Sequence, residues 1–389
     1  MKISKKISFF EILINIGFVI GLFYVIPYQS NTYANFGIAV TVALSIIEII
    51  RHRYFKKSTY IFFAFRIILL LYFWCQISFS SVTSILASTV RLKEMALNLI
   101  WGYFIYRFFR FRKDKDILVL LILSTIILSI FQISLVGFDL RNDTTSFNIN
   151  TLGLLCGYSA AFSLYIYFNE RKVIYILVLI FCSTVVLLTG SRQALISLLI
   201  PVATILINKN RNKKLTRFII VVVLLIVVFE LLMNVPALYE IVGYRIENLF
   251  NSLESGTSSE TSMANRMMHY VKAKQLIVDK PWFGYGLDSY RFLAHSTVYS
   301  HSNFMELLVS GGIIAFALYY MPLIIMLINL VKIKKKQLRV YMLISMLITQ
   351  ILMEYFLVAY YRHFVMLLYV IFLIFYEREL SEKMCFIES

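Results

Sequence analysis

Residues 262–321 read SMANRMMHYVKAKQLIVDKPWFGYGLDSYRFLAHSTVYSHSNFMELLVSGGIIAFALYYM. The first part of this stretch is polar, basic and rich in aromatic residues, and it leads directly into an apolar run that begins near Asn303. This change of character is typical of a loop that enters a membrane helix. We therefore expect the stretch to organise the fold and to hold the side chains that carry chemistry.

The composition of the whole chain predicts an all-α polytopic membrane protein. Its 389 residues are 60% hydrophobic and only 15% charged, which leaves too little polar surface for a soluble globular protein. Apolar runs near the ~20 residues that cross a bilayer must be helical, because lipid offers the backbone no hydrogen-bond partners. We predict about twelve spans, at residues 8–27, 33–50, 59–80, 94–109, 117–137, 151–168, 173–189, 194–208, 218–233, 303–331, 340–357 and 364–377.

The charge pattern predicts the orientation of these spans. Most of the 38 basic residues lie in alternate connections, such as RHRYFKK at 51–57 and KIKKKQLR at 332–339. By the positive-inside rule both termini are cytoplasmic, so the net charge of +17 reflects topology and does not indicate nucleic-acid binding. The four cysteines show no CxxC motif and no cluster with histidine, so we expect neither a metal site nor a disulfide framework.

One external connection is far longer than the others and divides the chain into three parts of one membrane domain. Residues 1–233 hold nine spans, residues 234–302 form a large extracytoplasmic loop, and residues 303–389 hold three spans and a cytoplasmic tail. The first span lacks a small-residue cleavage site and is expected to stay as an anchor. Loops of such length usually carry function or are disordered.

Two amphipathic helices are predicted within the large loop. The first has an apolar stripe at Leu238, Val242, Ile246, Leu249 and Leu253. The second begins near Ser262 and ends near Asp279, before Pro281. Its apolar side holds Met263, Met267, Tyr270 and Ile277, and an adjoining face holds Arg266, His269 and Ala273. The glycines in the GYG sequence that follows do not form a dinucleotide motif, because no strand precedes them.

His301 is the first candidate for a catalytic base. It stands immediately before a helix whose start is marked by Asn303 and Glu306 at capping-box spacing. His295 competes for the same role, and residue type alone does not separate the two histidines.

Two arginines lie in unusually apolar surroundings. Arg192 is the sole charged residue from Val173 to Ile207, at the predicted outer surface, where it serves either as an interfacial anchor or in function. Arg66 lies within the third span, and we expect its side chain to extend to the cytoplasmic face.

Three motifs in this order resemble those of the O-antigen polymerase and O-antigen ligase superfamily, which includes capsular polysaccharide polymerases. They are TGSRQALIS around Arg192, NRMMHYVKAK around Arg266, and HSNFMELLVSGG from His301. The topology, with one large external loop late in the chain, is also similar to that of the family. Two positions depart from its pattern: Ser302 stands where asparagine is frequent, and Ser310 where an acidic residue is frequent.

The resemblance implies a transfer of glycan from an undecaprenyl-diphosphate lipid to an acceptor hydroxyl, without metal, nucleotide or other cofactor. In this scheme Arg192 and Arg266 bind the diphosphate, with Arg245 and Arg291 as secondary candidates. His301 is the general base, with His295 as the secondary candidate. Attack from the face opposite the diphosphate would invert the anomeric centre.

The function that the resemblance implies is polymerisation of lipid-linked repeat units into the O-antigen of lipopolysaccharide or into capsule, at the extracytoplasmic face of the bacterial inner membrane. A ligase that attaches finished glycan to an acceptor has the same catalytic layout and stays open. A flippase or transporter is disfavoured by the missing internal repeat and the scarcity of ionisable residues deep in the spans. The expected partners are lipid-linked oligosaccharides, membrane lipid and a chain-length regulator, and not nucleic acid.

Overall fold

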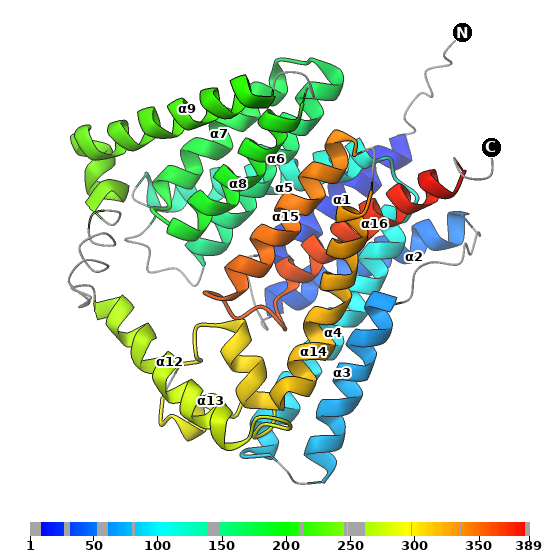
Figure 1. Cartoon of the computed structure of the whole chain (residues 1–389). Helices are drawn as coiled ribbons and strands as arrows, with labels where there is room; N and C mark the ends of the chain where they lie inside the picture. The colour runs from blue at the N-terminus through cyan, green and yellow to red at the C-terminus, as the bar shows by residue number, and fades with distance from the viewer. Residues whose placement is uncertain are drawn as a thin grey trace.

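The structure is a computed structural model that describes residues 9–26, 32–52, 61–79, 82–138, 140, 148–209, 214–244, 247, 261–296, 298–333 and 336–385. Within these ranges every regular element is helical (Figure 1). The elements are α1 (Phe9–Val25), α2 (Thr32–His52), α3 (Ile61–Ser78), α4 (Ile85–Arg110), α5 (Asp114–Val136), α6 (Ile149–Glu170), α7 (Ile174–Leu188), α8 (Arg192–Asn208), α9 (Lys214–Asn234), α10 (Pro236–Leu238), the π-helix η2 (Tyr239–Gly243), α12 (Thr261–Asp279), α13 (Tyr290–Leu293), α14 (Asn303–Val331), α15 (Leu338–Glu354) and α16 (His363–Cys385).

The predicted helical class is confirmed, and each apolar segment predicted as a span falls on one of these helices. In the part of the chain that the structure describes, five helices are long and apolar enough to cross a membrane, namely α2, α3, α5, α6 and α14. Three further apolar helices, α1, α7 and α8, are shorter. The total of twelve spans and the division of the chain at 233 and 302 therefore stay predictions.

Ion pairs gather the basic connections at one end of the bundle. Arg112, between α4 and α5, pairs with Glu48 of α2 at 2.9 Å. Arg339 of α15 pairs with Asp114 of α5 at 2.6 Å, and Arg378 of α16 pairs with the same carboxylate. The basic connections at 107–115 and 332–339 therefore lie beside each other and beside the start of the basic tail.

The opposite end is built on three long helices. Helices α3, α4 and α14 run side by side, and α12 and α13 lie across their ends away from the basic connections (Figure 1). Helix α12 ends at Asp279, as predicted from the proline at position 281. The loop that follows α12 packs directly onto α14.

Helix α14 is interrupted at Gly312, and the loop after α12 fills the interruption. Gly312 has φ 64° and ψ −162°, a combination that is open almost only to glycine. The N–H groups of Tyr285 and Gly286 donate to the carbonyls of Val309 and Ser310 at 2.9 and 2.8 Å. These bonds satisfy carbonyls near the kink and fix the loop to the helix that follows His301.

The start of α14 differs from the predicted capping box. Ser302 is the N-cap, and its Oγ accepts a hydrogen bond from the N–H of Met305 at 3.4 Å. Asn303 instead forms hydrogen bonds with residues distant in sequence, and Glu306 forms them with Ser300, just before the helix. The Glu306 carboxylate accepts from the backbone N–H and the Oγ of Ser300 at 3.0 and 2.7 Å. The cap prediction was wrong because sequence spacing does not show that Asn303 is needed elsewhere.

The expectation for Arg66 was also wrong. Its side chain is buried inside the bundle, with the guanidinium 3.6 Å from the ring centroid of Tyr319 and 5.1 Å from that of Phe62. A desolvated cation over aromatic rings gains about 2 kcal/mol, which offsets part of the cost of burial. Tyr319, the nearer of the two aromatic partners, comes from α14, so only the packed bundle completes this site.

The large loop is described in part. Leu238 closes α10 and Val242 lies in η2, while the other three residues of the first predicted stripe, and Arg245, fall outside the described residues. In α12 the face that holds His269 and Ala273 is buried, whereas Met267, predicted on its apolar side, is exposed. Tertiary contacts with α13 and α14 decide which side of α12 is covered.

Candidate active site

His301 is held between two buried serines at the entrance to α14. Its backbone is left-handed, with φ 60°, which is uncommon for a residue other than glycine. Ser300 is bound to Glu306, and its Oγ also donates to the carbonyl of Ser302 at 3.0 Å. Because both neighbours are completely buried, the backbone of His301 is fixed and its ring has a defined position.

The ring of His301 faces α12 and lies among aromatic neighbours. Its centroid is 4.8 Å from that of Tyr299 and 5.7 Å from that of His269. His269 is itself oriented by Tyr290 of α13, whose hydroxyl lies 2.8 Å from the imidazole Nδ1. Arg266 precedes His269 by one turn of α12 and is half-buried. Helix α12 of the large loop and the kinked helix α14 thus come together at His301.

Arg362 forms the third side of the site and was missed by the sequence analysis. It lies in the turn between α15 and α16, and its Nη2 donates to the hydroxyl of Tyr299 at 3.3 Å. Its side chain is 3% exposed, yet Nε and Nη1 have no hydrogen-bond partner among the described residues. Buried donors without partners cost about 1–3 kcal/mol each, so such groups call for a functional explanation.

Asn303 holds the turn that carries Arg362. The Asn303 Oδ1 accepts the N–H groups of Ala359 and Tyr360 at 2.8 and 2.9 Å. The Asn303 Nδ2 donates to the buried carboxylate of Glu354 at 2.9 Å. The first residue of α14 therefore positions the α15–α16 turn beside His301, which explains why Asn303 is not a cap.

Burial and neighbouring cations keep His301 neutral. Burial, and secondarily the charges of Arg266 and Arg362 and the neighbouring imidazole of His269, lower the pKa of His301 to about 4. Burial, with the nearby charge of Lys272, also lowers the pKa of His269. At neutral pH both imidazoles are therefore uncharged, and a free ring nitrogen of His301 can accept a proton.

Residues 177–320 match a protein-family model described as O-antigen ligase. The resemblance to the O-antigen polymerase and ligase superfamily is confirmed. The matched region contains Arg192, Arg266 and His301 and ends before Arg362. No curated protein matches the chain.

The two arginines that the O-antigen polymerase and ligase resemblance assigned to the diphosphate, Arg266 and Arg192, lie on different helices. Arg266 lies near enough to His301 for its charge to lower the pKa of that histidine. Arg192 is the half-buried first residue of α8, and the next side chain, Gln193, donates to the carbonyl of Phe356 at 3.1 Å. Tyr270 of α12 donates to the preceding carbonyl, that of Tyr355, at 3.2 Å. Helices α8 and α12 thus reach the same turn, while a role for Arg192 at the diphosphate stays a prediction.

The secondary candidates for the base and for the diphosphate-binding cations are His295, Arg291 and Arg245. His295 is exposed, just after α13. The guanidinium of Arg291 pairs with Asp288 at 2.7 Å, an ion pair that also involves Arg91 at 3.5 Å. Arg245 lies outside the described residues.

Within the described part of the chain, no three histidine, cysteine or acidic side chains lie close enough to hold a metal ion.

A signal for Arg362 was present in the sequence. The run YYRH at 360–363 puts a charged residue at the predicted outer end of the last span, where few charges occur.

Proposed function

We propose that the protein is a membrane glycosyltransferase that polymerises undecaprenyl-diphosphate-linked oligosaccharide repeat units into O-antigen or capsular polysaccharide. The observation that carries the proposal is a neutral, half-buried His301 near Arg266 and Arg362, the second of which has two buried N–H groups without a partner among the described residues. The family match supports a polymerase or ligase of this class. A base next to paired cations suits a reaction in which a hydroxyl attacks and a diphosphate leaves.

The reaction assigns one role to each group. The acceptor hydroxyl oxygen bonds to the anomeric carbon of the donor sugar as the bond from that carbon to the diphosphate oxygen breaks. His301 takes the hydroxyl proton, and undecaprenyl diphosphate leaves as an anion. Because the diphosphate is a weakly basic leaving group, it needs cations and not a general acid. Attack from the opposite face inverts the anomeric centre.

Arg266, Arg362 and Arg192 form the proposed diphosphate site. A guanidinium binds phosphate oxygens through charged hydrogen bonds, and the Nε and Nη1 of Arg362, which have no partner among the described residues, can donate to them. The bound anion also acts on the base. Since the arginine charges lower the pKa of His301, their neutralisation by diphosphate raises that pKa toward the range in which a base is effective.

The proposed location is the extracytoplasmic face of the bacterial inner membrane, with both termini in the cytoplasm. It rests on the basic connections, which ion pairs gather at the end of the bundle away from α12 and α13. Lipid-linked oligosaccharides and membrane lipid are the expected partners, together with a chain-length regulator.

The lipid-linked glycans of a deletion strain separate this proposal from its alternatives. Without a polymerase, single repeat units should accumulate on the carrier lipid, and the wild-type gene should restore the ladder of long chains. Full-length polymer that stays on the carrier would identify the protein as a ligase. Repeat units trapped on the cytoplasmic side would identify a flippase. The measurement is electrophoresis and mass spectrometry of the extracted glycans.

Lysine substitutions should separate phosphate-binding arginines from structural ones. Arg266→Lys and Arg362→Lys keep the charge but lose the planar fork, so transfer should fall roughly 10- to 100-fold, as expected for lost charged hydrogen bonds. Arg291→Lys is the matched control, because lysine can keep the ion pair with Asp288. Rates are measured with purified protein at matched folded amounts. Normal transfer by both site variants, with loss in the control, would contradict the proposed diphosphate site.

A further inference from the structure

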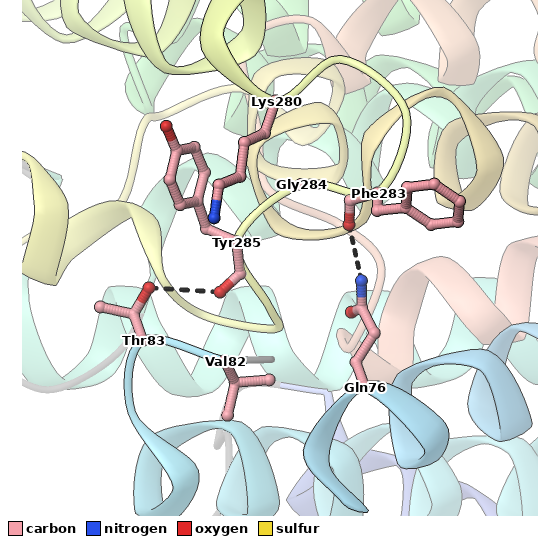
Figure 2. Close-up of a pocket in the computed structure, with 7 residues that line it drawn as sticks. All are labelled: Gln76, Val82, Thr83, Lys280, Phe283, Gly284 and Tyr285. Atoms are coloured by element: carbon pink, nitrogen blue, oxygen red, sulfur yellow. Dashed lines mark hydrogen bonds between the residues drawn. The ribbon is translucent and has the colours of Figure 1, made fainter. Parts of the chain in front are cut away.

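A polar pocket lies beside the loop after α12, outside the arrangement around His301. It has a volume of about 570 Å³, within the range of pockets that take small organic ligands. Figure 2 shows its walls: one is formed by Lys280, Gly284 and Tyr285 of the loop, and the other by Gln76 and Thr83 near the α3–α4 connection. None of the residues that surround His301 lines it.

The pocket is preformed because hydrogen bonds join its two walls. The Gln76 Nε2 donates to the carbonyl of Phe283 at 2.6 Å. The backbone N–H and the hydroxyl of Thr83 both donate to the carbonyl of Tyr285 at 3.1 and 3.2 Å. The walls are therefore already ordered before a ligand binds, and binding loses little conformational entropy in ordering them.

The polar and charged side chains of the lining indicate the chemistry of a ligand. Gln76 is 9% exposed, and its Oε1 has no hydrogen-bond partner among the described residues. In Figure 2 this oxygen points away from the Phe283 carbonyl, toward the side of Tyr285. Lys280 is the only charged residue among the described residues of the lining, and its Nζ lies 4.5 Å from the centroid of the Tyr285 ring. Among the described residues, the lining thus holds a cation, an amide and an aromatic ring, without a carboxylate.

We infer that this pocket is a second saccharide subsite, which binds a sugar of the repeat-unit oligosaccharide away from the reacting bond. The Lys280 ammonium can donate to hydroxyl or carboxylate oxygens of the sugar, and the Gln76 amide, whose Oε1 is buried without a partner among the described residues, forms part of the same lining. The inference rests on the proposed function for the identity of the ligand. It explains why a polar pocket is built into the loop that also fixes α14.

The pocket is coupled to the reacting centre by the same helix. The loop that forms it bonds to Val309 and Ser310, and Val309 lies about 9 Å from the start of α14 at 1.5 Å per residue. An oligosaccharide of several sugars can therefore reach from this pocket toward His301. A subsite at that separation would favour acceptors or donors of the correct repeat structure.

The test is saturation-transfer NMR with the protein in nanodiscs and the free repeat-unit oligosaccharide, released from the lipid-linked pool of the native cells by mild acid. Lys280→Met should raise the Kd about tenfold, as expected for a lost charged hydrogen bond. Lys274→Met, on the exposed part of α12 and outside the lining, is the matched control and should bind like the wild type. Gln76→Met should also weaken binding, and the melting temperature of each variant shows that it is folded.

The outcomes separate the subsite from the catalytic proposal. The loss of binding caused by Lys280→Met should be equally large in a His301→Ala background, because His301 does not line the pocket. Undiminished transfer by His301→Ala would overturn the catalytic proposal and leave the subsite standing. No binding by the wild type, equal binding by wild type and Lys280→Met, or displacement of the sugar by inorganic phosphate alone would overturn the subsite.

Discussion

His301→Ala should reduce glycan transfer by roughly 10²–10⁴-fold, the usual contribution of a general base. Alanine cannot accept the proton of the acceptor hydroxyl, whereas Ser302 still caps α14 and Ser300 still binds Glu306. Membrane abundance should therefore stay normal, and single repeat units should accumulate on the carrier lipid. The measurement is a glycan ladder from cells that lack the native gene, complemented at matched expression.

His295→Ala is the matched control for that experiment. His295 also has a left-handed backbone, with φ 47°, but its side chain is exposed, whereas that of His301 is half-buried. Its replacement should leave most of the ladder intact. His301→Asn guards against misfolding, because asparagine tolerates the left-handed backbone at φ 60° and lacks a suitable base. A full ladder from both His301 variants would falsify the assignment of the base.

Gly312→Ala should prevent recovery of folded protein. A Cβ at Gly312 would lie 2.2 Å from the carbonyl oxygen of Trp282 and 2.6 Å from the N of Phe283, and both atoms are backbone. The kink and the loop after α12 would have to separate, and with them the bonds of Tyr285 and Gly286 to α14. We expect the variant to lack a monodisperse peak in size-exclusion chromatography after detergent extraction.

Gly137→Ala isolates the cause of that effect. Gly137 has φ 78° and ψ −156°, nearly the same backbone conformation, but a Cβ there meets nothing within 4 Å. Its substitution adds only the backbone strain, about 1–3 kcal/mol, and should lower the melting temperature modestly. Equal behaviour of the two variants would mean that strain alone, and not the close approach of loop and helix, makes Gly312 necessary.

The helices were predictable because a bilayer leaves the chain little choice. An apolar run such as 151–168 must be helical wherever it is buried, and α6 is found there as Ile149–Glu170. The end of α12 was equally local, since Pro281 prevents a helix from continuing past Asp279. The basic clusters predicted that alternate connections lie at the same end of the helix bundle. The ion pairs of Asp114 with Arg339 and Arg378 bring three of these basic segments together.

The roles of Asn303 and Arg66 could not be predicted in this way. Asn303 has the residue type and position of a cap, but it binds Glu354 and the turn at Ala359, more than fifty residues away. Arg66 lies over Tyr319, which belongs to a helix late in the chain. In both cases the partner is distant in sequence, so no local pattern reports it.

The sequence by itself determined that the chain is a helical membrane protein, where its helices lie, and that Arg266 and His301 belong to one motif set. Only the tertiary structure decided which histidine is enclosed: His301 is held beside His269 and Tyr299, whereas His295 is exposed. The structure alone also brought Arg362 to the site, through the bonds of Asn303. The physical reason is that burial and charge at a point depend on elements folded around it, while helix formation in lipid depends on the local chain.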